Sequence, residues 1–211
     1  MTTTSWVLLA VALAFACADW WATWADRPDV RHITKPATLV FLIGVAVTLT
    51  PVDDTIRTWM VIGLVLSLAG DVFLMLPEKW FVAGLGSFLL GHIAYIVGLQ
   101  LAPRSWGWTA LGLAVVLVAI ATVGRRVVQG VAAGEQREMV GPVIAYLVVI
   151  SAMVVSAFGT AAPWAIAGAS LFYASDATLA WNRFLDQRRF GPLAVMITYH
   201  LGQIGLVAWL V

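Results

Sequence analysis

Long apolar segments follow one another through almost the whole chain, and this succession limits the possible fold more than any other feature. We expect eight of them, near residues 5–24, 36–50, 56–76, 80–101, 106–126, 140–158, 162–181 and 190–211. Because 62% of the residues are hydrophobic and only 11% are charged, there are too few polar groups to cover a soluble domain of this size. The sequence therefore predicts an all-α, polytopic membrane helix bundle that forms a single transmembrane domain over residues 1–211.

The eleven tryptophans fall at or near the expected segment ends, as the side chains of interfacial belts do. The second segment is short for a membrane span, which needs about 20 residues. The longest polar stretches, 25–35, 125–139 and 182–189, are expected to be loops. The first segment has the small, apolar residues of a signal peptide, but it lacks a positively charged start, so we expect an uncleaved helix.

Basic residues are distributed unevenly between the two sides of the expected bundle. Ten of the twelve lie in or beside the odd-numbered loops, and only Arg57 and Arg104 lie on the other side. Cytoplasmic loops of membrane proteins carry an excess of Lys and Arg. The sequence therefore predicts that both termini face away from the cytoplasm.

Polar residues inside the apolar segments mark the candidate site, because ionisable groups are costly in lipid and usually face a protein interior or a wet cavity. Asp71 and Asp176 lie about a turn and a half from the expected cytoplasmic ends of their segments, and Lys35 lies at the start of the second segment. We expect the two acids to face each other in one cavity that opens toward the cytoplasm. The other candidate cavity residues are His92, Tyr95, Ser175, Asn182, Tyr199, His200 and Gln203.

Each of these residues also has a structural interpretation. Asp71 can be an acid satisfied by Lys35 or by a neighbouring helix, and His92 can be packed and hydrogen-bonded without chemistry. Asn182 can simply end a helix. The stretch 67–95 weakly resembles the stretch 170–200 in the order of its polar residues, so a parallel internal duplication is a further hypothesis.

Several kinds of site find little support in the sequence. It holds no nucleophile elbow, metalloprotease helix, phosphate-binding loop or dinucleotide-binding pattern. The single Cys17 cannot form an intrachain disulfide, and the net charge of +1 gives no indication of a nucleic-acid partner. Three histidines and several aspartates could supply metal ligands, but His32 is expected in a loop and no two histidines share a helix at ligand spacing. We expect neither a metal nor a cofactor.

Four motifs together resemble the YhhN/TMEM86 family of lysoplasmalogenases from about residue 30 to the end of the chain. They are SLAGDVFLML, FVAGLGSFLLGHIAYIVGL, GASLFYASDATLAWNRF and YHLGQIGLVAWL. The Lys35-Pro36 pair fits the same family, whereas the first segment and the stretch 125–139 match it poorly. Asp71, Asp176 and most of the candidate cavity residues coincide with its recurrent polar positions.

The resemblance implies an enzyme that hydrolyses the vinyl ether of a 1-alkenyl lysophospholipid taken from the inner leaflet, with the bacterial inner membrane as the expected location. The products would be a fatty aldehyde and a glycerophosphoethanolamine or glycerophosphocholine. One of the paired acids, Asp71 or Asp176, would be neutral and protonate carbon while the other is ionised; the sequence leaves their order open. Two alternatives remain: a transporter of lipids or small molecules, and a metal-dependent intramembrane hydrolase.

Overall fold

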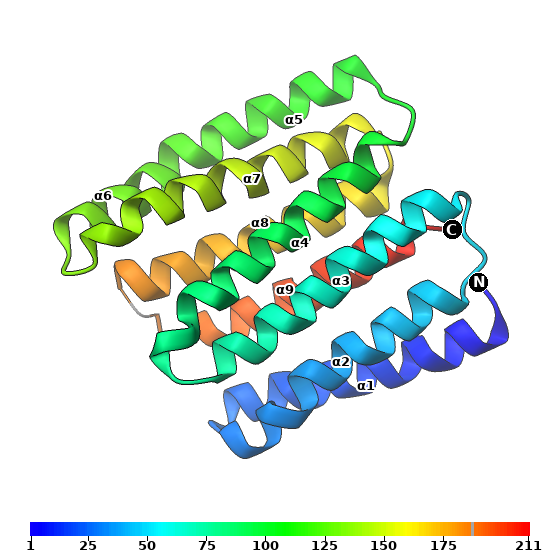
Figure 1. Cartoon of the computed structure of the whole chain (residues 1–211), viewed down its shortest axis with the longest axis horizontal. Helices are drawn as coiled ribbons and strands as arrows, with labels where there is room; N and C mark the ends of the chain where they lie inside the picture. The colour runs from blue at the N-terminus through cyan, green and yellow to red at the C-terminus, as the bar shows by residue number, and fades with distance from the viewer. Residues whose placement is uncertain (187) are drawn as a thin grey trace.

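The computed structural model describes residues 1–186 and 188–211, and these residues form long helices that run back and forth along one axis (Figure 1). A π-helical turn, Ile120–Gly124, joins the fifth and sixth helices without a break. The α-helices of the described residues are α1 (Thr3–Trp24), α2 (Pro28–Thr48), α3 (Asp54–Met75), α4 (Phe81–Gln100), α5 (Trp106–Ala119), α6 (Arg125–Ala133), α7 (Val140–Gly159), α8 (Pro163–Phe184) and α9 (Gly191–Ala208).

The helices have the length and composition of membrane spans. Among the described residues, seven helical stretches are long and apolar enough to cross a membrane, with α5 and α6 counted as one. The remaining long helix, α8, has 22 residues but is more polar, since it carries Asp176 and Asn182. Large hydrophobic side chains such as Trp106 and Trp164 are exposed on the outside of the bundle, where lipid would cover them. The protein is an integral, multi-pass membrane protein of the all-α class.

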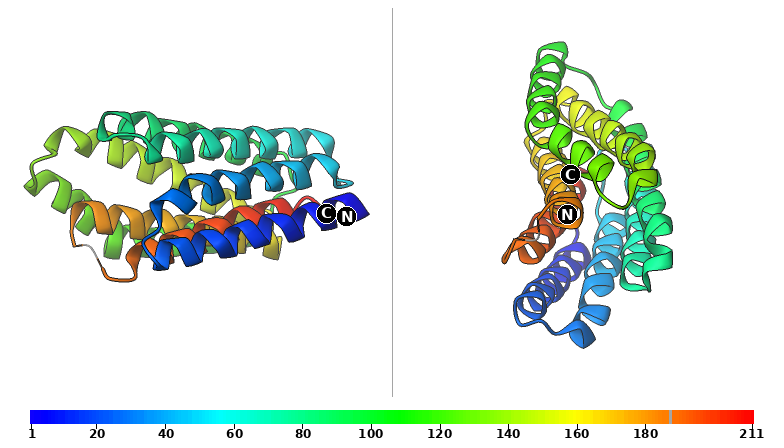
Figure 2. Two further views of the ribbon diagram at one scale, coloured as in Figure 1. Left: turned by 90° about the horizontal axis from the view of Figure 1, so that it is seen from below. Right: turned by 90° about the vertical axis from the view of Figure 1, so that its left-hand side faces the viewer.

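Three helical hairpins build most of the bundle: α1 with α2, α3 with α4, and α8 with α9. The helices α7, α4, α3 and α2 follow one another across the front of Figure 1, while α8 and α9 lie behind them. Helix α7 contacts α4, α5 and α8, and α9 contacts α1, α2 and α3. Figure 2 shows α1 and α9 side by side in the rear layer. Polar contacts cross between the two layers, such as the hydrogen bond from Tyr199 on α9 to Asp71 on α3.

Helix α2 begins at Pro28, well before the expected start at residue 36. A proline is well suited to the first turn, where no N–H is required. The negative charge of Asp29 in the same turn interacts favourably with the positive end of the helix dipole. The polar stretch that follows is therefore helical, and His32 lies in a helix and not in a loop. The early start places Lys35 two turns inside the helix and fixes the direction of its side chain.

The polar stretch 125–139 also differs from the sequence expectation, because its first part is helix α6. Val127 and Val131 lie one turn apart on the buried face of α6 and pack beside Phe81 and Phe184. A helix with one apolar stripe among polar residues is typical of an amphipathic surface helix. Mean hydropathy, which averages over both faces of a helix, does not detect helix α6.

Helices α8 and α9 approach closely through glycines. A Cβ atom at Gly168 would lie 2.6 Å from the backbone nitrogen of Leu206, and one at Gly202 would lie 2.9 Å from that of Phe172. Small residues at such interfaces let helix backbones come together. This approach sets the positions of Asp176 on α8 and Tyr199 on α9.

Both chain termini lie at the same end of the bundle (Figure 1). There the backbone N–H of Val52, in the connection between α2 and α3, donates to the carbonyl oxygen of Leu210 at 3.0 Å. Which end faces the cytoplasm stays a prediction from the distribution of basic residues.

Candidate active site

A cavity of about 520 Å³ lies in the half of the bundle away from the two termini. Its wall is mostly apolar, with Val127, Val143 and Ile150 among the lining residues. Asp71 and Asp176 both line it, as do Lys35 and Tyr199. The structure thus brings the two intramembrane acids to one cavity, with the neighbouring lysine and tyrosine that the sequence indicated.

Asp71 is fully buried near the C-terminal end of α3 and is held by two side chains from other helices. The Nζ atom of Lys35 lies 2.9 Å from its Oδ1 atom, and the hydroxyl of Tyr199 donates to Oδ2 at 2.7 Å. A buried carboxylate is tolerated when it is both paired and hydrogen-bonded. These contacts favour the ionised form of Asp71.

Asp176 has different surroundings. The hydroxyl of Tyr146, on α7, donates to its Oδ2 atom at 2.5 Å, and Nε2 of His92 lies 3.7 Å from the same oxygen. Among the described residues, no donor is bonded to Oδ1, and the side chain is 15% exposed toward the cavity. The imidazole of His92 packs edge-on against Tyr146 and Phe172, so it supports the acid from outside the cavity lining.

The polar partners are exchanged between two hairpins. Asp71 belongs to the α3–α4 hairpin and contacts Tyr199 on α9, whereas Asp176 belongs to the α8–α9 hairpin and lies near His92 on α4. Each acid therefore depends on the other hairpin for a neighbour. The internal duplication suggested by the sequence would produce such an exchange, and it stays a hypothesis.

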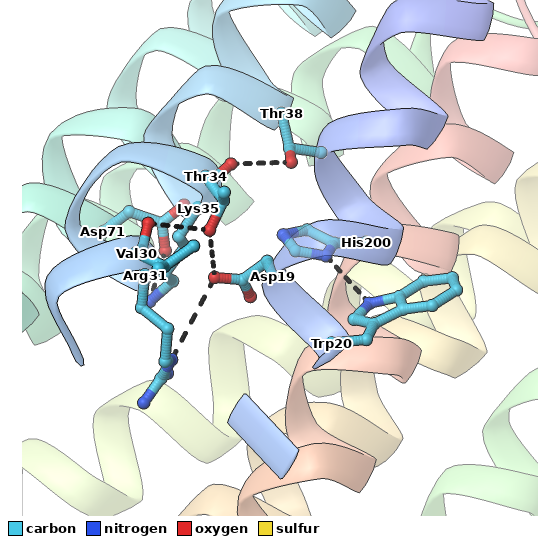
Figure 3. Close-up of polar contacts among 9 residues, drawn as sticks. All are labelled: Asp19, Trp20, Val30, Arg31, Thr34, Lys35, Thr38, Asp71 and His200. Carbon is cyan, nitrogen blue, oxygen red and sulfur yellow. Dashed lines mark hydrogen bonds and ion pairs between the residues drawn. The ribbon is translucent and has the colours of Figure 1, made fainter. Parts of the chain in front are cut away.

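Besides His92, three of the residues expected in the cavity lie outside its lining. The hydroxyl of Tyr95 donates to Oε1 of Gln203 at 2.6 Å, and both side chains are fully buried between α4 and α9. Nδ1 of His200 accepts from Nε1 of Trp20 at 3.0 Å and so faces α1 (Figure 3). Successive residues of a helix point about 100° apart, which is why Tyr199 reaches the cavity and His200 does not.

Ser175 and Asn182 do line the cavity, but each is bonded to backbone. The hydroxyl of Ser175 donates to the carbonyl of Val195 at 3.0 Å and ties α8 to α9. Oδ1 of Asn182 accepts from the backbone N–H of Arg188 at 3.3 Å, just after α8 ends. Both residues therefore shape the wall by holding the α8–α9 hairpin.

Sequence reasoning missed Tyr146, which is the closest partner of Asp176. A signal was available, because Tyr146 is the one tyrosine in a segment that is otherwise apolar except for two serines. It also left a further buried acid, Asp19, out of the candidate site, and Figure 3 shows the contacts of this residue. There Thr34 donates to Oδ1 of Asp19 at 3.0 Å, and Nε of Arg31 lies 4.0 Å from the same oxygen.

Metal-ligating side chains are dispersed in the part of the chain that the structure describes. It contains no group of three or more His, Cys, Asp or Glu side chains placed to hold a metal ion together. The acids at the cavity are instead surrounded by a lysine and tyrosines. This arrangement suits proton transfer and charge stabilisation.

Comparison with known proteins adds independent information about this site. The profile of the YhhN family matches residues 30–210, nearly the whole chain. The chain belongs to the YhhN family. This confirms the resemblance seen in the motifs around Asp71 and Asp176. No solved structure matches this YhhN-family chain.

Several relatives of this YhhN-family protein have names that state an activity. A protein of Mycobacterium tuberculosis named lysoplasmalogenase is 37% identical over 181 residues, which are 82% of this chain and 67% of the relative. A protein of Mus musculus named lysoplasmalogenase TMEM86B is 29% identical over 198 residues, 91% of this chain and 81% of the relative. An Escherichia coli O157:H7 membrane protein named YhhN is 32% identical over 93 residues, 44% of this chain and 43% of the relative.

Proposed function

We propose that this protein is a lysoplasmalogenase that hydrolyses the vinyl ether bond of a 1-alkenyl lysophospholipid. The observation that carries the proposal is the pair of carboxyl groups, Asp71 and Asp176, on the wall of one largely apolar cavity. Its relatives named lysoplasmalogenase, aligned over most of the chain, support the same reaction. The products are a fatty aldehyde and a glycerophospho-headgroup.

The chemistry of a vinyl ether explains why two acids are needed. A proton is added to the alkene carbon remote from oxygen, which leaves an oxocarbenium ion on the adjacent carbon and oxygen. Water then adds to that carbon and loses a proton, which gives a hemiacetal. The hemiacetal loses its hydroxyl proton and the glycerol oxygen gains one as the bond between carbon and that oxygen breaks, which releases the aldehyde. One group must give a proton to carbon, and a second must stabilise the cation and accept a proton from water.

The two environments suggest how the tasks are divided. Asp71 has an ammonium partner in Lys35, so we assign it the ionised role: it stabilises the oxocarbenium ion and accepts the proton of the attacking water. Asp176 has no lysine or arginine within ion-pair distance among the described residues, and its partly exposed side chain lines the cavity. We assign Asp176 as the acid, oriented by the Tyr146 hydroxyl and the nearby His92 ring.

The shape of the cavity suits an amphiphilic substrate. Its apolar wall, formed in part by Leu85 on α4, Val127 on α6 and Leu147 on α7, can receive the hydrocarbon chain. Its polar side carries Lys35, two turns inside α2, and Asn182, near the C-terminal end of α8. A lysolipid from the inner leaflet would then place its headgroup at the mouth and its vinyl ether beside the acids.

A direct assay tests the proposal. Purified protein in detergent is offered a 1-alkenyl lysophospholipid and the matching 1-acyl lysophospholipid, and aldehyde and fatty acid are measured by mass spectrometry. We expect aldehyde from the alkenyl substrate and no fatty acid from the acyl one, because an ester cannot be cleaved by protonation of an alkene carbon. Release of fatty acid, or no release of aldehyde by folded protein, would contradict the proposal.

A further inference from the structure

Three basic side chains line the cavity among the described residues, and two of them are already engaged. Lys35 lies 2.9 Å from Asp71. Arg183 is bonded to Glu78 and stacks over the ring of Phe81, with its guanidinium carbon 4.5 Å from the ring centre. These two cations hold the bundle together at the site. The third, Arg31, is the one left to meet a ligand.

Arg31 has only a loose protein partner in the part of the chain that the structure describes. Its Nε atom lies 4.0 Å from Oδ1 of Asp19, which is beyond hydrogen-bond distance. This Nε atom is buried and has no hydrogen-bond partner among the described residues, although the side chain as a whole is 33% exposed. A buried donor without an acceptor carries a free-energy cost. An anion in the cavity would remove that cost.

The position of Arg31 relative to the acids matches the dimensions of a lysophospholipid. Arg31 and Lys35 are four residues apart on α2, so they lie on one face slightly more than one turn, or about 6 Å, apart along the axis. Arg31 is nearer the N-terminal end of α2, and Lys35 lies at the depth of Asp71, with which it pairs; Figure 3 shows these side chains together. In the lipid, a three-carbon glycerol separates the ether oxygen from the phosphate, a span comparable to that turn.

We propose that Arg31 binds the phosphate of the lysophospholipid and thereby sets the depth of the vinyl ether at Asp71 and Asp176. The inference rests on the proposed function for the identity of the lipid. A guanidinium offers two parallel N–H donors to phosphate oxygens, an arrangement that an ammonium cannot reproduce. Asp19, itself hydrogen-bonded to Thr34, lies 4.0 Å from Nε of Arg31 without accepting a hydrogen bond from it, so Nε and a terminal nitrogen remain as the paired donors for the phosphate.

Kinetics with paired substrates test this role. The first substrate is a 1-alkenyl lysophosphoethanolamine, and the second is the 1-alkenyl glycerol with the same chain but no phosphate. We expect Arg31→Gln to raise KM for the first roughly 10- to 100-fold, the effect of losing a charged hydrogen-bonding pair, with kcat nearly unchanged. KM for the glycerol should not move. Equal effects on both substrates would overturn the proposal.

Two further variants make the comparison specific. Arg31→Lys keeps the charge but not the paired donors, so it should recover only part of the phosphate preference. Arg27→Gln removes a basic residue that is bound to Asp29 outside the cavity and should leave the preference as in the unmodified protein. A loss of preference in Arg27→Gln as large as that in Arg31→Gln would mean a general surface-charge effect and would contradict the assignment.

A binding experiment separates this inference from the proposed reaction. A 1-O-alkyl lysophosphoethanolamine, which has no alkene to protonate, should raise the thermal unfolding temperature more than the 1-O-alkyl glycerol does, and Arg31→Gln should abolish the difference. This result in a protein that cleaves no vinyl ether would uphold the phosphate site and refute the proposed function. Cleavage with unchanged discrimination in Arg31→Gln would do the reverse. Stabilisation by inorganic phosphate as large as that by the lipid would also overturn the assignment of a lipid headgroup.

Discussion

The Nζ atom of Lys35 lies 2.9 Å from Oδ1 of Asp71, and both side chains are buried between α2, α3 and α9. Bringing two charges out of water is costly, and their mutual attraction offsets this cost only when the geometry is good. The hydroxyl of Tyr199 completes the arrangement by donating to the other carboxylate oxygen. The pair therefore fixes the charge of one catalytic candidate and joins three helices at the cavity.

Removal of one member of this pair should be strongly destabilising. Lys35→Met leaves Asp71 without its counter-ion, and we expect a loss of roughly 3–5 kcal/mol in unfolding free energy, as for other broken buried pairs. The double variant Lys35→Met/Asp71→Asn should recover much of the stability but none of the activity. Chemical unfolding in detergent micelles measures both effects. Additive losses in the double variant would show that the two side chains do not interact.

The close contact of α8 and α9 predicts a steric effect at Gly168. Even Gly168→Ala places a Cβ atom against the backbone of α9, and backbone cannot move aside as a flexible side chain can. We expect a lower unfolding temperature and reduced activity, because the added methyl group would push α8 and α9 apart, and these helices carry Asp176 and Tyr199. Gly86→Ala is the matched control: it too is a helical glycine, but nothing lies within 4 Å of its added Cβ. Equal effects of the two substitutions would contradict the argument.

The orientation of the bundle can be tested with a pair of single cysteines. In a Cys17→Ala background, Asp29→Cys and Asp54→Cys place exposed thiols at opposite ends of the bundle. If the basic end faces the cytoplasm, an impermeant maleimide applied to intact spheroplasts should label position 54 and leave position 29 unlabelled until the membrane is opened. The opposite labelling pattern would invert the predicted topology, and with it the leaflet from which substrate enters.

The sequence was sufficient to predict a membrane bundle and to select Asp71 and Asp176, because both conclusions depend on the cost of polar groups in lipid. This cost implies that each acid needs a polar partner, but it does not identify the partner. The partner Tyr146 comes from α7, and identifying it requires the packing of α7 on α8. Lys35 could be predicted as a neighbour of Asp71 only because it lies at a similar depth on the adjacent segment.

The boundaries of α2 and α6 were missed for a different reason. Mean hydropathy detects the part of a helix that lies in lipid, whereas Pro28–Lys35 and Arg125–Ala133 are helical and polar. Capping residues and a one-sided apolar stripe were the available signals. The same limitation applies to Arg31. Its relation to the site is not apparent when residues 25–35 are assigned to a loop, whereas in the helix it lies one turn before Lys35.

The proposed mechanism makes its strongest prediction for the two acids. Asp71→Asn and Asp176→Asn preserve shape and most hydrogen bonding but can neither donate nor accept the proton. We expect each to lower kcat by ~10²–10⁴-fold, the range typical of general acid–base catalysis. Both variants should still unfold cooperatively, but Asp71→Asn at a lower temperature, because Lys35 loses its charged partner. Asp29→Asn removes an exposed acid that is paired with Arg27 and serves as the control, with activity near that of the unmodified protein.

The isotope effect and the response to chelation then separate this mechanism from its rivals. If transfer of a proton to carbon is rate-limiting, turnover in D₂O should be slower than in H₂O, and EDTA should leave it unchanged. His92→Ala should reduce activity less than either Asn variant, because the imidazole lies behind Asp176 and outside the cavity lining. Near-normal aldehyde release by Asp71→Asn or Asp176→Asn would refute the two-carboxyl mechanism, and inactivation by EDTA would favour a metal-dependent hydrolase in its place.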